Sequence, residues 1–337
     1  MKILIVGDWN WPFYEKALFD GFIDRGFDTA KYNTRIETSG FFLDSIQTKF
    51  KIGKLISKKN NEFIRYLSQN TPDVIFFYRP EIFFEETIQH IKNRFNPILL
   101  GYHNDNPFIQ WNKSVKYRYF FKNIKYWDIC YAYRKSNINH YKTFGGKNIK
   151  LLLPYYVKGI HDKDFDNERD IDVIFIGHYE NDGRLECCMY LKEHGINIKI
   201  FGPEWPVHAS QDYGGINPIF NDEYVNKLGS AKIALVFLSK VNHDKYTRRN
   251  FEIPATGAFM LTERTSTLRQ LFIEGQECDF FSSKEELLKK VQFYLSNDRL
   301  RKKIANAGMR KCLKAKHNNI GRVEQIMEDI KSLQRNG

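Results

Sequence analysis

The sequence has few cysteines and no long apolar run, and both absences limit where the protein works. Its five cysteines show neither a disulfide-like pairing nor a zinc-ligand spacing. No apolar run reaches the length of a transmembrane helix, and the run near the N-terminus, residues 3–7, is too short for a signal peptide. We therefore expect a cytoplasmic protein with reduced thiols.

Several catalytic and binding motifs are also missing. The sequence contains no G-x-G-x-x-G, no P-loop and no G-x-S-x-G nucleophile elbow, so dinucleotide, Walker-type and serine-hydrolase functions have no motif in their favour. No pair of histidines has the spacing of metal ligands. We expect no metal site and no resident cofactor.

Positive charge is abundant and concentrated in the first half. The net charge is +12, of which +8 falls in residues 1–170 and +4 in residues 171–337. Two basic and aromatic stretches, residues 49–65 and 113–125, contribute much of the excess. Such stretches contact anionic lipid, nucleic acid or charged glycans, but a solvated helix face with its aromatic side chains in the core has the same pattern.

Short apolar segments alternate with polar helical ones along most of the chain. This pattern predicts an α/β fold with parallel sheets covered by helices on both faces. The expected strands are residues 2–6, 27–32, 73–78, 97–102, 128–133 and 149–153, then 172–176, 196–201, 232–238 and 258–261. A polar stretch, residues 154–170, separates the two series. The sequence therefore predicts two doubly wound, Rossmann-like domains.

Ligands of such sheets bind at the carboxyl ends of the strands, so the residues that follow the expected strands are candidates. Gly7, Asp8 and Trp9 follow the first strand, Arg79 follows the third, and His103 and Asp105 follow the fourth. In the second series, Gly177 and Gly202 each follow a strand, and Arg184 lies near the start of the next helix.

Residues 247–264, TRRNFEIPATGAFMLTER, read as a short helix, a Gly turn and a buried strand. A helix start and arginine side chains both favour phosphate, and Arg248 and Arg249 stand at that start. Glu252 cannot favour phosphate, but it can accept hydrogen bonds from two neighbouring hydroxyls, as on a ribose. This spacing suits a nucleoside diphosphate, although a surface Arg–Glu pair is an equally simple reading.

Four segments resemble the CgeB-type (spore maturation) branch of group 1 glycosyltransferases. They are residues 172–184, 198–205, 247–264 and 274–308, and the R-x-F-E-x-P-x-x-G core at 249–257 is the most specific part. The first half is similar more loosely, through Gly7, the Asp-Asn-Pro at 105–107 and the Leu-Pro at 153–154. The first three of these segments, residues 172–184, 198–205 and 247–264, also resemble the phage DNA β-glucosyltransferases more faintly.

The resemblance implies a GT-B fold, with the acceptor on an N-terminal domain at residues 1–160 and the donor on a domain at 171–315. A last helix within 316–337 would cross back to the first domain. Arg184 and Arg249 would hold the diphosphate and Glu252 the ribose hydroxyls. Asp244 stands where many group 1 enzymes have a glutamate, which puts its sugar-binding role in doubt. The remaining residues assigned to the donor by this resemblance are Gly177, Gly202, Tyr246, Thr247 and Arg248.

These expectations describe a metal-independent glycosyltransferase that takes a nucleotide sugar, with a UDP-sugar as first choice. Arginines and helix starts stabilise the leaving diphosphate, and Asp105, with His103 as substitute, would be the general base of an inverting reaction. The acceptor would be a surface glycan, a lipid-linked precursor or a protein, and a peripheral contact with the inner membrane face fits the basic stretches. Alternatives are a DNA-modifying transferase and a nucleotide-sugar-binding protein without turnover.

Overall fold

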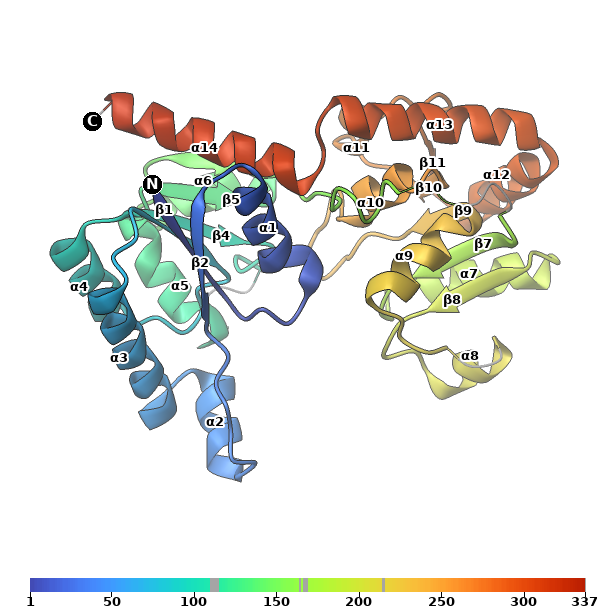
Figure 1. Cartoon of the computed structure of the whole chain (residues 1–337). Coiled ribbons are helices and arrows are strands. Elements are labelled where there is room, and N and C mark those ends of the chain that lie inside the picture. Colours follow the sequence, from blue (N-terminus) through green and yellow to red (C-terminus); the bar gives the residue numbers. More distant parts are fainter. Residues whose placement is uncertain (110–114, 164, 166–168, 214–215, 337) are drawn as a thin grey trace. The chain divides into compact units, whose positions relative to one another are not determined.

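The computed structural model describes residues 1–109, 115–163, 165, 169–213 and 216–336 of the chain (Figure 1). The chain forms two compact units, Met1–Leu153 together with the residues from Arg322 onward, and Pro154–Gly321. Each unit contains one parallel sheet, as the alternating sequence pattern predicts. No helix in the described part of the chain is long and apolar enough to cross a membrane.

The first unit is built on a six-stranded sheet in the order β2-β1-β3-β4-β5-β6. The strands are β1 (Lys2–Gly7), β2 (Asp28–Asn33), β3 (Val74–Tyr78), β4 (Ile98–His103), β5 (Ile129–Ala132) and β6 (Ile149–Leu151). The central strand β3, with the sequence VIFFY, is buried at every position because both faces of the sheet are covered. The edge strand β2 is largely exposed and more polar.

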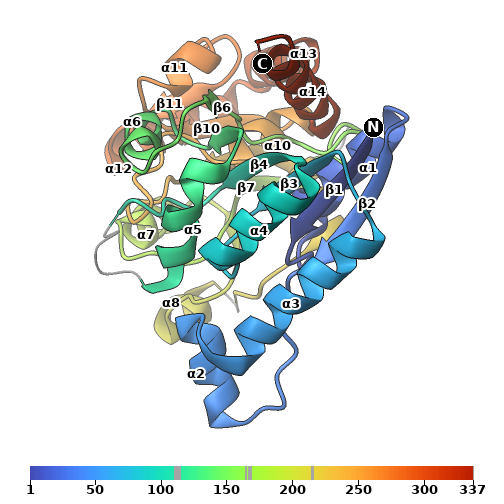
Figure 2. The same ribbon diagram turned by 90° about the vertical axis from the view of Figure 1, so that its left-hand side faces the viewer.

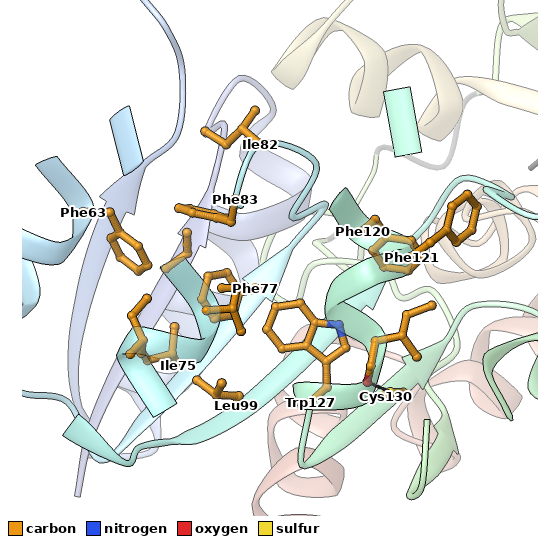
Figure 3. Close-up of a cluster of buried hydrophobic side chains, with 14 of the residues drawn as sticks. Phe63, Ile75, Phe77, Ile82, Phe83, Leu99, Phe120, Phe121, Trp127 and Cys130 are labelled. Carbon is orange, nitrogen blue, oxygen red and sulfur yellow. Dashed lines mark hydrogen bonds between the residues drawn. The ribbon is translucent and has the colours of Figure 1, made fainter. Parts of the chain in front are cut away.

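Helices cover both faces of this sheet. The helices of this unit are η1 (Pro12–Lys16), α1 (Ala17–Asp24), α2 (Phe42–Phe50), α3 (Gly53–Gln69), α4 (Glu85–Phe95), η2 (Val115–Tyr117), α5 (Arg118–Asn123), η3 (Ile124–Tyr126), η4 (Lys135–Asn137) and α6 (Ile138–Thr143). Figure 2 shows α3, α4 and α5 over one face, and α1 lies on the other. Phe63 of α3 and Phe77 of β3 meet in the aromatic core beneath these helices, together with Trp127 (Figure 3).

The last helix, α14 (Asn319–Asn336), packs on the first unit through its residues from Arg322 onward. The Arg322 side chain donates to the Leu153 carbonyl at 2.9 Å, and Gln325 donates to the Leu151 carbonyl at 2.8 Å. The Tyr131 hydroxyl donates to Asp329 at 3.1 Å. The C-terminal helix thereby completes the first unit from the other end of the sequence.

The second unit contains a five-stranded sheet in the order β11-β10-β9-β7-β8. The strands are β7 (Ile171–Ile176), β8 (Ile198–Phe201), β9 (Ala231–Val236), β10 (Phe259–Glu263) and β11 (Asp279–Phe281). In both units the first strand lies between the second and the third, so chain connections diverge on either side of it. Ligands of doubly wound sheets bind at this switch point, which is beside β1 and β3 in one unit and beside β7 and β9 in the other.

The helices of the second unit are α7 (Arg184–Glu193), α8 (Val207–Asp212), α9 (Asn221–Gly229), α10 (Arg249–Ala255), α11 (Leu268–Leu271), α12 (Lys284–Ser296) and α13 (Asp298–Lys314). The predicted helix, Gly turn and strand of residues 247–264 are confirmed as α10, Gly257 and β10. Gly257 has a φ of +70°, which ordinary side chains rarely adopt. Strand β11 was not predicted, because its three residues are too few for a pattern.

Candidate functional site

Two glycines form the floor of the candidate donor site at the carboxyl edge of the second sheet. Gly177 follows β7 and Gly202 follows β8, as predicted. Gly202 has a φ of +144°, and a Cβ there would lie 1.9 Å from the Gly177 carbonyl oxygen. Only glycine fits this contact, since any side chain would push the two turns apart. The Trp205 indole also donates to the Gly177 carbonyl, at 3.0 Å, and holds the turn in place.

Arg249, the first residue of α10, reaches over this floor. A Cβ at Gly177 would lie 3.4 Å from the terminal guanidinium nitrogen of Arg249, so the two residues are neighbours although far apart in sequence. The Nε atom of Arg249 is buried and has no hydrogen-bond partner among the described residues. An arginine with an unused donor beside a glycine turn is an arrangement that receives phosphate oxygens.

Glu252 lies one turn further along α10 and is almost completely buried. Its carboxylate pairs with Arg248 Nε at 2.7 Å, accepts the Tyr224 hydroxyl at 2.5 Å and lies 3.4 Å from His161 Nε2. Burial alone would raise the pKa of Glu252, but Arg248, His161 and Tyr224 outweigh it and lower the pKa to about 2. Glu252 is therefore an ionised acceptor, and its partner is Arg248 in a buried pair rather than Arg249 in a surface pair.

The guanidinium of Arg184 is already engaged by neighbouring residues, whereas a phosphate-binding arginine needs donors that can reach the phosphate. Its side chain is buried, and it donates to Asp182 from Nε at 2.8 Å and from NH2 at 2.6 Å. A third donor reaches the His178 carbonyl at 2.7 Å. In this conformation Arg184 holds the turn between β7 and α7 closed, and binding a diphosphate would require an exchange of these contacts. Its role toward the donor stays a prediction.

The loop before α10 carries the other expected donor residues. The Asp244 amide donates to the Ser239 carbonyl at 2.9 Å, and Tyr246 is buried. The Thr247 amide donates to the side chain of Asn250 at 2.8 Å. Asn250, which the sequence did not mark as a candidate, is fully buried and thereby fixes the approach of the loop to the start of α10.

In the first unit, Asp8 and Arg79 meet at the switch point. The Arg79 guanidinium donates to both carboxylate oxygens of Asp8, at 3.0 and 2.8 Å. Trp9 and Arg79 have φ values of 58° and 53°, which are uncommon for residues other than glycine and are often found at functional sites. The Trp9 indole donates to the Tyr32 carbonyl at 3.0 Å.

Glu15 is a titratable group in this region that the sequence gave no reason to select. Its side chain is fully buried against Gly7, where a Cβ would lie 2.5 Å from Glu15 Cγ. Neither carboxylate oxygen has a hydrogen-bond partner among the described residues, although Arg79 NH2 lies 3.6 Å away. Burial raises the pKa of Glu15 to about 7, and the opposing effect of Arg79 is too small to prevent this.

His103 and Asp105, the two base candidates, differ in access. His103 ends β4 with its side chain fully buried, and its Nε2 atom lies 3.1 Å from Glu81 Oε1. Asp105 is partly exposed and lies 3.7 Å from the Lys116 ammonium. Burial would raise the pKa of Glu81, but His103 and Lys116 lower it below its ordinary value. Of the two base candidates, Asp105 is therefore the one that solvent reaches.

Glu81, His103 and Asp105 also form a cluster with ligand atoms within 4.8 Å of one another, a donor set that suits a divalent ion. The sequence did not predict this cluster. The Lys116 ammonium lies 3.3 Å from Glu81 and 3.7 Å from Asp105, so a positive charge already lies among the carboxylates. These residues therefore fit a metal ion poorly while Lys116 stays in place.

A hollow of ≈ 270 Å³ opens beside these groups. Its charged lining consists of Asp8, Arg35, Lys51, Arg79, Glu81 and Lys116. Four cations against two carboxylates give it an excess of positive charge. The first expected basic stretch contributes Lys51, and the second contributes Lys116, while residues 113–114 of that stretch lie outside the described residues.

Comparisons with known proteins bear on both units. Residues 184–328 match a family model described as "Glycosyl transferase-like". No curated protein sequence matches the chain. The structure is similar to that of Alr3699/HepE from Anabaena in complex with UDP-glucose, with a TM-score of 0.71 and 10% identity over 98% of this chain and 100% of that chain.

Two further structures show the same architecture. Sucrose-phosphate synthase (tll1590) from Thermosynechococcus elongatus gives a TM-score of 0.69 at 10% identity, with all of both chains covered. A protein from Listeria monocytogenes described as a UDP-N-acetylglucosamine 2-epimerase gives 0.62 at 15% identity, over 100% of this chain and 97% of that one. The fold is thus GT-B, and the part of the chain that matches the glycosyl transferase-like model is residues 184–328.

Proposed function

We propose that this chain is a CgeB-type glycosyltransferase that moves a sugar from a nucleoside diphosphate sugar to an acceptor hydroxyl. The observation that carries the proposal is the position of Arg249 over the Gly177 turn, with ionised Glu252 one turn away on the same helix. Arg249 would stabilise the charge that grows on the leaving diphosphate. Glu252 would accept the ribose hydroxyls in exchange for part of its present contacts with Arg248, Tyr224 and His161. The segment that matches the glycosyl transferase-like model contains both residues.

We propose a UDP-sugar as the donor and a reaction without a resident cofactor or metal ion. The similarity to Alr3699/HepE, whose structure holds UDP-glucose, supports uridine as the first base to test. Arg249 supplies positive charge at the diphosphate position, which is the task that a metal ion performs in other transferases.

On the acceptor side, Asp105 is the proposed base, because it is exposed to solvent whereas His103 is buried against Glu81. The hollow at Asp8 and Arg79 is the proposed acceptor region, and its positive lining suits an anionic glycan or a lipid-linked acceptor better than a neutral sugar. A protein acceptor is the remaining choice. We place the protein in the cytoplasm, in peripheral contact with the inner membrane face.

A thermal-shift screen against UDP-, GDP-, dTDP- and CMP-sugars tests the donor class, since a ligand that binds the folded state raises the unfolding temperature. A UDP-sugar should give the largest shift, and transfer to an added acceptor should follow. Conversion of UDP-N-acetylglucosamine into its epimer without an acceptor would instead assign the epimerase reaction. Binding without any turnover would assign a nucleotide-sugar-binding protein.

Duplex DNA is an alternative acceptor to the glycan, lipid-linked and protein acceptors, because the chain is strongly basic. A DNA-modifying enzyme would bind duplex DNA with an affinity that falls steeply as salt increases, and would transfer sugar to it. Transfer to DNA in the presence of the best donor would replace the glycan, lipid-linked and protein acceptors proposed above.

A further inference from the structure

An unusual group of exposed apolar side chains lies around α2 in the first unit. Phe41, Phe42 and Leu43 are consecutive and are 73%, 79% and 68% exposed. Phe50 and Ile52, at the other end of the same segment, are also exposed, and no residue of α2 is buried. We call these five residues the α2 tip. Consecutive exposed apolar side chains of this kind mark an interaction site, whereas single exposed apolar residues are ordinary.

Hydrogen bonds and close packing fix α2 to the helices α3 and α5. The Gln47 side chain accepts the Leu55 amide at 3.0 Å, and a Cβ at Gly53 would collide with Gln47, so α2 and α3 are closely joined. Arg118 of α5 donates to the Lys51 carbonyl at 2.7 Å and ties the joint to the rest of the unit. Figures 1 and 2 both show α2 standing away from the sheet, beyond the start of α3. The apolar side chains are therefore presented outward by a braced helix.

The segment that carries the α2 tip is rich in lysine. Five lysines fall within residues 49–59, namely Lys49, Lys51, Lys54, Lys58 and Lys59. Lys51 lies 4.0 Å from Glu81 and Lys58 lies 3.9 Å from Glu62, so Lys49, Lys54 and Lys59 supply the excess of positive charge. The acid in residues 41–59 is Asp44, whose carboxylate is engaged by Ser39. Apolar side chains beside an excess of lysines match the acyl boundary and the anionic headgroups of a bilayer. A second copy of this chain fits less well, because a symmetric contact would place two groups of lysines against each other.

We infer that the α2 tip inserts into the headgroup–acyl boundary of an anionic bilayer. This inference deepens the peripheral contact proposed above by naming the residues that enter the membrane, and it holds whether or not the chain transfers sugars. Thr48 and Lys51, on the same segment, also line the positively charged hollow. Insertion of the tip would bring that hollow toward the phosphate level of the membrane, where a lipid-linked acceptor presents its headgroup.

Sedimentation with vesicles of phosphatidylcholine and phosphatidylglycerol tests the inference with the full-length chain. The wild type should sediment with these vesicles and much less with phosphatidylcholine alone. The F41S/F42S variant should bind the anionic vesicles roughly tenfold or more weakly, since it loses two apolar anchors. The matched control is F293S, which removes a half-exposed phenylalanine of the second unit and should bind like the wild type.

Depth is measured separately with F42W and vesicles that contain brominated lipids. The added tryptophan should be quenched beyond the level of the wild-type tryptophans, and circular dichroism should show that all variants are folded. Absence of wild-type binding, equal binding by F41S/F42S, or unchanged quenching in F42W would each overturn insertion. Equal wild-type binding to neutral vesicles would overturn the preference for anionic lipid, and concentration-dependent dimerisation that F41S/F42S abolishes would assign the tip to self-association.

Discussion

Arg249 and Glu252 occupy neighbouring turns of α10 but differ in their freedom to meet a ligand. Glu252 is enclosed by Arg248, Tyr224 and His161, whereas the Nε donor of Arg249 has no partner among the described residues. We therefore expect Arg249→Ala to weaken nucleotide-sugar binding by about 1.5–3 kcal/mol, the usual cost of a lost charge-assisted contact. Calorimetry measures this, with the exposed Arg269→Ala as control. Unchanged affinity in a folded Arg249→Ala protein would remove the donor assignment.

Glu15 makes stability depend on pH in a direction opposite to most carboxyl groups. Its pKa in the folded protein is raised to about 7, above its ordinary value of 4.5, so the folded state holds a proton that the unfolded state releases. Stability should therefore fall as the pH rises from about 4.5 to about 7. Glu15→Gln removes this penalty, and its unfolding temperature should exceed that of the wild type at pH 8 but not at pH 4. An equal difference at both pH values would show that burial does not shift this group.

Asp105 is the residue on which the proposed chemistry depends most directly. Asp105→Asn keeps the size of the side chain and removes the base, so turnover should fall by roughly 10²-fold or more while donor affinity stays nearly unchanged. The partly exposed Asp20→Asn serves as control. We expect the product to have the anomeric configuration opposite to that of the donor. Near-normal turnover, or a retained configuration, would point to assistance by the leaving phosphate.

At the scale of elements, α14 stabilises the first unit from the far end of the sequence. Val323, Ile326 and Ile330 of this helix are buried. Ile326→Ala should destabilise the first unit by about 2–5 kcal/mol, the usual cost of a cavity in a core. Thermal unfolding with and without a bound nucleotide measures this. The nucleotide should raise the unfolding temperature of the second unit, and Ile326→Ala should lower the unfolding temperature of the first. The exposed Lys331→Ala should leave both transitions in place, and an Ile326→Ala protein with wild-type melting would show that α14 is dispensable.

The sequence predicted the elements better than the side-chain partnerships between them. Continuous apolar runs and the glycines that follow them placed Gly177 and Gly202 at strand ends, and the pattern of residues 247–264 placed Arg249 at a helix start, because those signals are local. Glu15, Glu81 and His161 were missed because their partners come from distant elements, and burial decides their charge state. Arg184 shows that the same holds for residues close in sequence. Asp182 lies two residues away, but the sequence alone does not show that the two side chains form a hydrogen-bonded ion pair.

For the whole molecule, the first five strands of each sheet follow the same order, yet the carboxyl edges of the two sheets carry different chemistry. The edge in the second unit has two glycine turns and Arg249, which suit a phosphate group. The edge in the first unit has paired acids and bases around a hollow with a positive lining. This division agrees with a donor on the second unit and an acceptor on the first, as the GT-B proposal requires.

The different residues at the two sheet edges also lead us to expect a reaction that does not depend on a metal ion. A divalent ion at Glu81, His103 and Asp105 would meet the ammonium of Lys116, which lies 3.3 Å from Glu81, and would have to displace it. At the proposed diphosphate position, Arg249 would supply positive charge. Activity should therefore survive EDTA to within about twofold, and Mn²⁺ should not raise it. EDTA saturated with Ca²⁺ is the control for effects unrelated to chelation. Full loss with EDTA and recovery with Mn²⁺ would show that the cluster binds metal and that Lys116 moves aside for it.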